Sequence, residues 1–114
     1  MHRSEIWLIN LDPTIGADVK KTRPAVIVND DTIGILPLKV IVPITEWKNR
    51  YAIAPWMVRL EPDPENNLDK LLVADAFQVR SVAQERFVRH LGKLPDRAMQ
   101  EITRALAVVL GMEP

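Results

Sequence analysis

Two side chains of complementary chemistry stand at the ends of strand-like apolar runs. Arg23 comes directly before the run 24–28, and Thr45 ends the run 38–45. A guanidinium is a permanent cation with a fork of N–H donors, and a threonine hydroxyl can both donate and accept a hydrogen bond. A folded barrel can bring such strand ends together, although 22 positions separate the two residues in the chain. A cation and a hydroxyl at one point suit the binding of a phosphodiester.

Short apolar runs separated by turn residues predict the strands that must position this pair. The helix is predicted over residues 95–110, where apolar residues recur at helical spacing, with Pro95 at its start and Gly111 at its end. Many strands followed by one helix favour a mainly β fold, a small and strongly curved antiparallel barrel, over any βαβ arrangement. The expected strands are residues 5–11, 24–28, 38–45, 56–60, 71–73, 76–82 and 87–91.

Two of these runs carry more detail about burial. The run 24–28 is apolar on both faces, which is typical of a central strand buried on two sides. In the run 38–45 the even positions are all apolar and predict a core face, so Thr45 should lie on the opposite face, where Pro43 marks an edge or a bulge. The run 24–28 and the helix also need more apolar cover than one small barrel gives, which favours a homodimer.

Length and composition limit the class of protein. At 114 residues the chain is expected to form one domain over residues 1–114, and no apolar run approaches the roughly 18 residues of a membrane span. The N-terminus shows no signal peptide, so we expect a cytoplasmic protein. Without cysteine there is no disulfide framework and no thiolate site. Because the formal net charge is zero, contact with nucleic acid must come from a local basic cluster, for which Lys20, Lys21 and Arg23 are the candidates.

Four sequence blocks resemble the MazF/PemK family of toxin endoribonucleases from type II toxin–antitoxin pairs. They are residues 5–16, 22–28, 42–45 and 78–81, in the family's order and over essentially the full chain. The resemblance implies an SH3-like barrel of the CcdB/PemK type that acts as a homodimer. It also implies sequence-specific cleavage of single-stranded RNA without a metal or any other cofactor, by a toxin that a cognate antitoxin holds inactive.

The resemblance assigns the catalytic pair to Arg23 and Thr45. RNA cleavage without a metal can use the ribose 2′-OH as nucleophile, which leaves a 2′,3′-cyclic phosphate and a 5′-hydroxyl. Arg23 would then stabilise the charge of the phosphorane, and Thr45 would hold a non-bridging oxygen or relay a proton. Asp18, at a place where relatives often have a carboxylate, is the candidate base. The chain departs from the family in the loop before Arg23, which lacks the usual glycines, and at Phe77, where an acidic residue is frequent.

Other residues are candidates for binding RNA. Gln78 and Arg80 share a face of the expected strand 76–82, and Trp47 could stack on a base or contact the antitoxin. Trp7 and Trp56 suit core or dimer packing better, while His2 and His90 do not form the pattern of a paired acid and base. The acidic loop 62–69 has no spacing of metal ligands, so no metal site is predicted. The candidate RNA-binding residues are Lys20, Lys21, Thr22, Gln78, Arg80 and Trp47.

Two other classes of function compete with RNA cleavage. Some toxins of the same fold do not cut RNA and instead inhibit DNA gyrase by binding, and a catalytically inactive relative could act in that way. Arg23 together with Thr45 favours cleavage. An SH3-like reader of chromatin or of the translation machinery would need a cage of aromatic side chains, and an aromatic content of 5% supplies little material for one.

Overall fold

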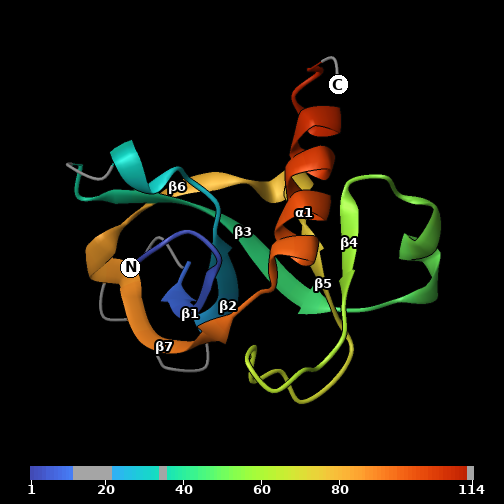
Figure 1. The fold of residues 1–114 in the computed structure, drawn as a ribbon, viewed down its shortest axis with the longest axis horizontal. Coiled ribbons are helices and arrows are strands. Elements are labelled where there is room, and N and C mark those ends of the chain that lie inside the picture. The colour runs from blue at the N-terminus through green and yellow to red at the C-terminus, as the bar shows by residue number, and fades with distance from the viewer. Residues whose placement is uncertain (12–21, 34–35, 113–114) are drawn as a thin grey trace.

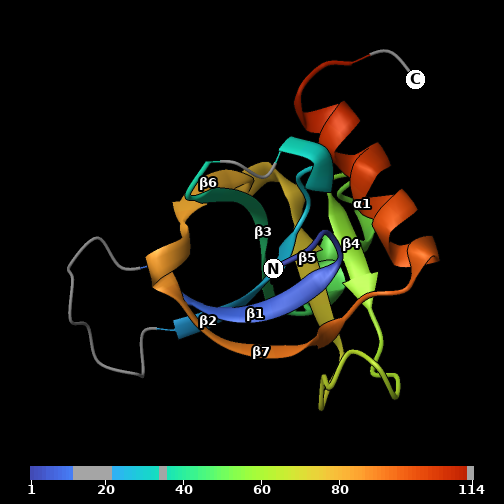
Figure 2. The ribbon, with the colours of Figure 1, turned by 60° about the vertical axis from the view of Figure 1, so that its left-hand side comes forward.

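The sheet of this protein is antiparallel, seven-stranded and strongly curved (Figures 1 and 2). It is seen in a computed structural model that describes residues 1–11, 22–33 and 36–112. Short 3-10 turns follow several strands, namely η2 (Asp31–Ile33), η3 (Asn49–Ile53), η4 (Ala76–Gln78) and η5 (Gln84–Arg86). The larger elements are β1 (Glu5–Asn10), β2 (Thr22–Ile27), β3 (Leu38–Glu46), β4 (Met57–Leu60), β5 (Leu72–Asp75), β6 (Arg80–Ala83), β7 (Phe87–Lys93) and α1 (Asp96–Val109).

The strand β3 organises the sheet because it changes partners along its length. The strand order is β4-β5-β3-β2-β1-β7, and β6 also pairs with β3. The first half of β3 pairs with β6 up to Ile41, and its last part pairs with β5 from Ile44 onward. Pro43 lies between these two ladders, at the point where β3 exchanges one neighbour for another. A proline is tolerated there because it has no N–H to give to a ladder, which agrees with the irregularity expected at this residue.

The helix α1 covers one side of this curved sheet and lies next to β4 and η4 (Figure 1). It begins at Asp96, one residue later than predicted, with Pro95 as its N-cap. At its other end Gly111 has a φ of 69°. The N–H of Met112 donates to Ala107 O at 2.8 Å, and the N–H of Gly111 donates to Val108 O at 3.3 Å, as in a Schellman motif. The expected closing role of Gly111 is therefore confirmed.

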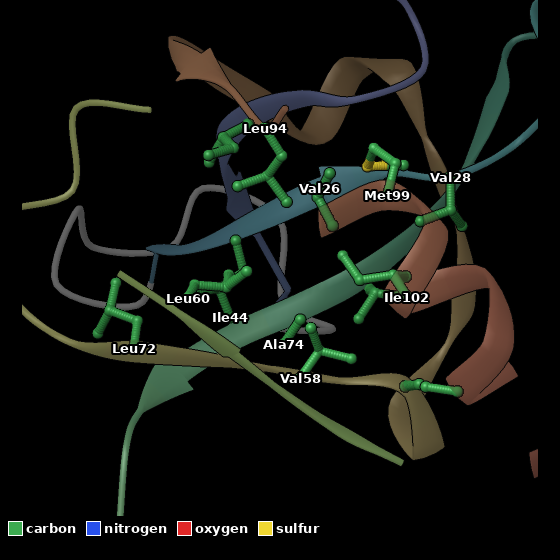
Figure 3. Close-up of a cluster of buried hydrophobic side chains, with 14 of the residues drawn as sticks. Val26, Val28, Ile44, Val58, Leu60, Leu72, Ala74, Leu94, Met99 and Ile102 are labelled. Atoms are coloured by element: carbon green, nitrogen blue, oxygen red, sulfur yellow. The ribbon is translucent and has the colours of Figure 1, made fainter. Parts of the chain in front are cut away.

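Two apolar clusters lie on opposite faces of β2. Val26 and Val28 belong to the larger cluster, between the sheet and α1, together with Met99 and Ile102 of the helix (Figure 3). Ala25 and Ile27 belong to a second cluster with Ile9, Ile41 and Val82. The predicted two-sided burial of this strand is confirmed. Both faces of β2 are covered within one chain, however, so this two-sided burial does not indicate a homodimer, contrary to the prediction.

The prediction of a single core face for β3 is also wrong. Ile41, which was placed on the outer face, is fully buried in the second cluster, and Lys39 is only 6% exposed. Leu38, which was placed on the core face, is 42% exposed. The physical reason is that β3 passes between two apolar clusters, so period-2 alternation separates one core from another and not core from solvent.

The predicted strand 76–82 is broken in the structure. Its first residues form η4, and only Arg80–Ala83 continue as a strand. Asp75 causes the break, because its side chain accepts the N–H of Phe77 at 3.1 Å and so caps the turn. Gln78 therefore lies on a turn and does not share a strand with Arg80.

The mainly β fold with a C-terminal helix is as predicted, within shifts of one to a few residues at the element ends. Within residues 1–11, 22–33 and 36–112 no helix, including the 14-residue α1, has the length and the apolar character needed to cross a membrane.

The loop between β4 and β5 approaches β7 closely at Gly92. A Cβ built on Gly92 would lie 2.3 Å from Glu65 O and 2.8 Å from the carbonyl carbon of Asn66. Because both neighbours are backbone, neither can rotate away as a side chain would. We expect Gly92→Ala to lower the free energy of unfolding by roughly 1–3 kcal/mol, the usual cost of overpacking.

Chemical denaturation of Gly92→Ala beside wild type would measure this cost. Lys93→Ala is the matched control, because its exposed side chain is removed while its N–H can still donate to Glu65 O at 3.1 Å. The control should stay within about 0.5 kcal/mol of wild type. Equal stability of Gly92→Ala and wild type would contradict the close approach.

Candidate active site

A pocket of about 290 Å³ lies where the ends of β2, β3 and β5 meet η3, η4 and β6. Four of the residues predicted for the site from the sequence, Arg23, Thr45, Gln78 and Arg80, line it together. The side chains of all four are exposed, so a polymer at the surface can reach them. The full lining consists of Leu11, Arg23, Pro43, Ile44, Thr45, Tyr51, Asp75, Gln78 and Arg80.

The register of two strands brings Arg23 and Thr45 together. Ala25 of β2 lies opposite Pro43 of β3. The β2–β3 ladder ends at this pair, and Arg23, two residues before Ala25, and Thr45, two residues after Pro43, both continue past it in the same direction, where period-2 geometry keeps them on the face of Ala25 and Pro43. The Nη1 atom of Arg23 donates to Thr22 O at 3.1 Å. The guanidinium is thus held at the start of β2, on the same pocket as the hydroxyl near the end of β3.

Asp75 is a pocket residue that the sequence analysis did not identify. It ends β5 and is 6% exposed. Its Oδ1 accepts the N–H of Phe77 at 3.1 Å, and its Oδ2 accepts Nε2 of Gln78 at 2.8 Å. A signal for it existed, because Asp75 ends an apolar run just as Thr45 does. Asp75 thus contacts Gln78 across the turn, while Phe77 is 65% exposed and packs edge-on against Trp56.

Tyr51 is the second pocket residue that was not predicted. It lies in η3, and the Arg50 guanidinium carbon lies 5.4 Å from its ring centroid. Trp47, a predicted RNA-binding residue, does not line the pocket but contacts Tyr51 edge-on, with the ring centroids 6.2 Å apart. The guanidinium carbon of Arg59 lies over Trp47, 5.6 Å from the ring centroid. Tyr51 is the chain's one tyrosine and follows the basic residues Lys48 and Arg50, which was the available signal.

Glu46, the residue after Thr45, forms an ion pair with Lys70. Lys70 Nζ contacts Glu46 Oε1, and the hydrogen bond from Lys70, followed by its positive charge, lowers the pKa of Glu46. The same contact raises the pKa of Lys70. Both side chains are exposed, so the pair adds little stability. Its effect is to keep Glu46 ionised and paired with a cation beside a site that would receive an anion.

The remaining predicted site residues have different places. Thr22 begins β2 opposite Asn10 and is half-buried. Asp18, Lys20 and Lys21 lie outside the described residues. The predicted absence of a histidine pair agrees with the geometry of the two rings, because His90 packs against Trp7 at 5.3 Å while His2 lies 3.8 Å from Asp31.

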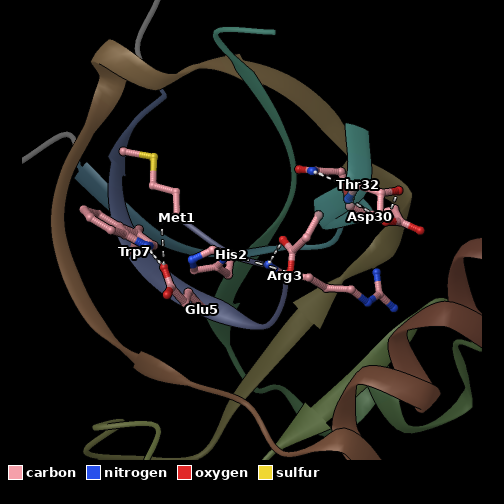
Figure 4. Close-up of polar contacts among 9 residues, drawn as sticks. Met1, His2, Arg3, Glu5, Trp7, Asp30 and Thr32 are labelled. Atoms are coloured by element: carbon pink, nitrogen blue, oxygen red, sulfur yellow. Dashed lines mark hydrogen bonds and ion pairs between the residues drawn. The ribbon is translucent and has the colours of Figure 1, made fainter. Parts of the chain in front are cut away.

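The N-terminal residues around His2 form a separate group of polar contacts (Figure 4). The N–H of Arg3 donates to Asp31 Oδ1 at 2.7 Å, and Trp7 Nε1 donates to Glu5 Oε1 at 2.9 Å. The side chain of Arg3 also donates to Val28 O. None of these residues lines the pocket that contains Arg23, so they hold the chain's first residues in place and are not part of the site.

The acidic loop 62–69 folds through its own polar groups. Asp63 Oδ1 accepts the N–H groups of Glu65 and Asn66, each at 2.8 Å. Asn66 is 1% exposed, and its Oδ1 accepts the N–H of Leu68 at 2.9 Å. Within residues 1–11, 22–33 and 36–112, no group of three His, Asp or Glu side chains is arranged to hold a metal ion.

The family described as PemK-like, MazF-like toxin of type II toxin–antitoxin system matches residues 2–110. This chain belongs to that family. It is 30% identical to the endoribonuclease MazF9 of Mycobacterium tuberculosis, with 98% of both chains covered. It is 31% identical to the endoribonuclease PemK of Escherichia coli, with 96% of this chain and 82% of PemK covered. The family predicted from the four sequence blocks is thus confirmed.

Solved structures show the same fold. An endoribonuclease in complex with its cognate antitoxin from Mycobacterial species matches 100% of this chain and 98% of its own, with a TM-score of 0.80 and 19% identity. MazF (Form-I) from Deinococcus radiodurans matches 98% of this chain and 97% of its own, with a TM-score of 0.75 and 23% identity. The predicted MazF-like barrel is confirmed. None of these relatives supports the alternative of a gyrase inhibitor.

Proposed function

We propose that this chain, as a single domain, is an endoribonuclease that cuts single-stranded RNA as the toxin of a type II toxin–antitoxin pair in the cytoplasm. The observation that carries the proposal is the placement of Arg23 and Thr45 on one pocket, in a chain of a family whose curated relatives are endoribonucleases. The strand register explains this placement. The site thus offers a cation and a hydroxyl to one phosphodiester.

The reaction is an intramolecular transesterification at phosphorus. The ribose 2′-oxygen attacks phosphorus, the bond from phosphorus to the 5′-oxygen breaks, and the products carry a 2′,3′-cyclic phosphate and a 5′-hydroxyl. The proton of the 2′-OH leaves to a base, and another proton goes to the departing 5′-oxygen. Arg23 stabilises the phosphorane, which carries more negative charge than the ground state, and Thr45 holds a non-bridging oxygen.

Of the two aspartates considered as the base, Asp75 and Asp18, only one is suited to accept a proton from the RNA. Both oxygens of Asp75 already accept N–H donors, from Phe77 and Gln78, so it is poorly placed to accept a proton from RNA. Asp18 remains the proposed base. Arg80 adds a second guanidinium to the pocket and binds the phosphate or its neighbour.

Next to this pocket, Tyr51 and Trp47 offer rings for stacking on the bases, with Arg50 and Arg59 beside them. Thr22, together with Lys20 and Lys21, which lie outside the described residues, binds phosphates. This contact is local, which suits a protein without net charge.

The partners we propose are single-stranded RNA, an antitoxin and a second copy of the chain. The antitoxin covers the basic pocket with a flexible acidic segment, and solved structures of this fold include an endoribonuclease in complex with its cognate antitoxin and a MazE-MazF complex. For the homodimer, the end of α1 offers exposed apolar side chains, with Val108 at 54%, Leu110 at 61% and Met112 at 62% exposure.

Cleavage in excess EDTA tests the proposal directly. We expect the purified protein to cut a long single-stranded RNA in EDTA and to leave 5′-hydroxyl ends, which a polynucleotide kinase labels without prior phosphatase treatment. Thr45→Ala should cut roughly 10- to 100-fold more slowly, because a hydrogen bond to a charged oxygen is lost. Thr45→Ser should keep part of the rate, since the hydroxyl remains. Wild-type cutting that requires added Mg²⁺, or full activity of Thr45→Ala, would contradict this mechanism.

A further inference from the structure

The pocket contains one buried carboxylate to which the reaction above gives no part. Asp75 is 6% exposed, whereas Gln78, its hydrogen-bond partner, is exposed and lines the pocket together with Arg23 and Thr45. Gln78 Nε2 donates to Asp75 Oδ2 at 2.8 Å, and the N–H of Phe77 occupies Asp75 Oδ1 at 3.1 Å. Asp75 thus holds the amide of Gln78 at the pocket wall.

This contact determines which way the amide of Gln78 points. A carboxylate can only accept hydrogen bonds, so the group that faces Asp75 must be the NH₂ of Gln78 and not its carbonyl oxygen. The Oε1 atom is then directed elsewhere. Among the described residues no donor occupies it, and the side chain is exposed to solvent. The assignment of O and N in this amide follows from the chemistry of its partner.

We propose that Asp75 is a positioning residue that locks Gln78 with its carbonyl oxygen toward the RNA, so that Gln78 selects a base by an N–H donor at one position of the cleavage site. This inference rests on the proposed function, since it concerns the RNA in the same pocket. Unstacked bases in single-stranded RNA are read by hydrogen bonds to their edges. A single fixed acceptor is enough to distinguish two bases of similar shape.

The selection acts within purines or within pyrimidines. Adenine carries an amino donor where guanine carries the O6 acceptor, and cytosine carries an amino donor where uracil carries the O4 acceptor. At the neighbouring ring nitrogen the polarity is reversed in each pair. An amide that turned over in the pocket would therefore exchange the preference between adenine and guanine, or between cytosine and uracil, at that position.

Asp75→Asn turns the amide over. The Oδ1 atom of the new side chain can still accept the N–H of Phe77, so its NH₂ faces residue 78. Gln78 then accepts this donor with Oε1 and presents its own NH₂ to the RNA. The double variant Asp75→Asn with Gln78→Glu is the matched control. Here the NH₂ at position 75 donates to the carboxylate at position 78, and the other carboxylate oxygen again offers an acceptor to the base.

The experiment compares wild type, Asp75→Asn and the double variant on an RNA with a randomised segment, and maps cut sites by sequencing. We expect Asp75→Asn to change the preference between adenine and guanine, or between cytosine and uracil, by roughly tenfold. The reason is that the NH₂ of Gln78 would then face a donor of the base that wild type prefers. The double variant should return the wild-type preference. The readout is a ratio between sites that differ in one base, which a general loss of activity or stability does not move.

Two results would overturn the inference. One is an unchanged base ratio in Asp75→Asn, and the other is the same altered ratio in both variants, which would mean that Asp75 has a structural role alone. A selection for RNA bound by the same three proteins runs in parallel. Absence of cleavage by wild type would refute the proposed function, while the bound sequences would still confirm or overturn the role of Asp75. Thermal unfolding of each variant identifies any that fail to fold.

Discussion

Replacing Arg23 with alanine lowers the rate of RNA cleavage by roughly 100- to 1000-fold, the usual cost of removing a group that stabilises charge in the transition state. The guanidinium lies at the start of β2, on the pocket that it shares with Thr45. Its charge and its fork of donors both act on the phosphorane. Because the side chain is exposed, its removal leaves no cavity in the core, and the fold should be retained.

The measurement is the initial rate of cleavage of one RNA in EDTA. Arg23→Lys keeps the charge but loses the planar fork, so we expect an intermediate rate. Arg97→Ala is the matched control, since it removes the same charge from an exposed position on α1 that does not line the pocket. Equal loss in Arg97→Ala would mean that overall charge, and not position, is what matters.

Truncation of Ile102 to alanine lowers the free energy of unfolding by roughly 2–5 kcal/mol. Ile102 is fully buried on α1 and packs into the larger cluster between the helix and the sheet (Figure 3). Its loss removes apolar contacts and leaves a cavity that rigid strands cannot collapse to fill. The expected cost is a large part of the stability of a domain of this size.

Chemical denaturation at one fixed protein concentration measures this loss, because association with a second copy would add to the apparent stability. Gln100→Ala is the control on the same helix. It truncates an exposed side chain outside the apolar end of α1, so its unfolding free energy should stay within about 0.5 kcal/mol of wild type. If the two variants unfolded at the same denaturant concentration, α1 would not pack as described.

The local pattern of the chain was enough to predict most elements. Alternating apolar residues and turn formers located the strands, and helical spacing located α1 to within one residue at its start. The sequence also predicted Arg23, Thr45, Gln78 and Arg80, in part from the chemistry of each side chain and in part from the family's sequence blocks. These features depend on residues close in the chain, where period and chemistry are visible directly.

Pairings between distant residues could not be predicted in the same way. The two-sided burial of β3 depends on its having clusters on both faces, and a sequence period cannot show whether the second face meets solvent or another core. The break at η4 came from one side chain that captured a backbone N–H.

The sequence by itself determined that this chain is a curved β barrel with a terminal helix, and which residues could act on a phosphodiester. Only the tertiary structure decided that Arg23 and Thr45 share one pocket, because the β2–β3 register sets which residues lie opposite each other. It also placed Tyr51 and Asp75 on this pocket. The donor that reaches the buried carboxylate of Asp75 is positioned by the turn and not by the spacing of apolar residues.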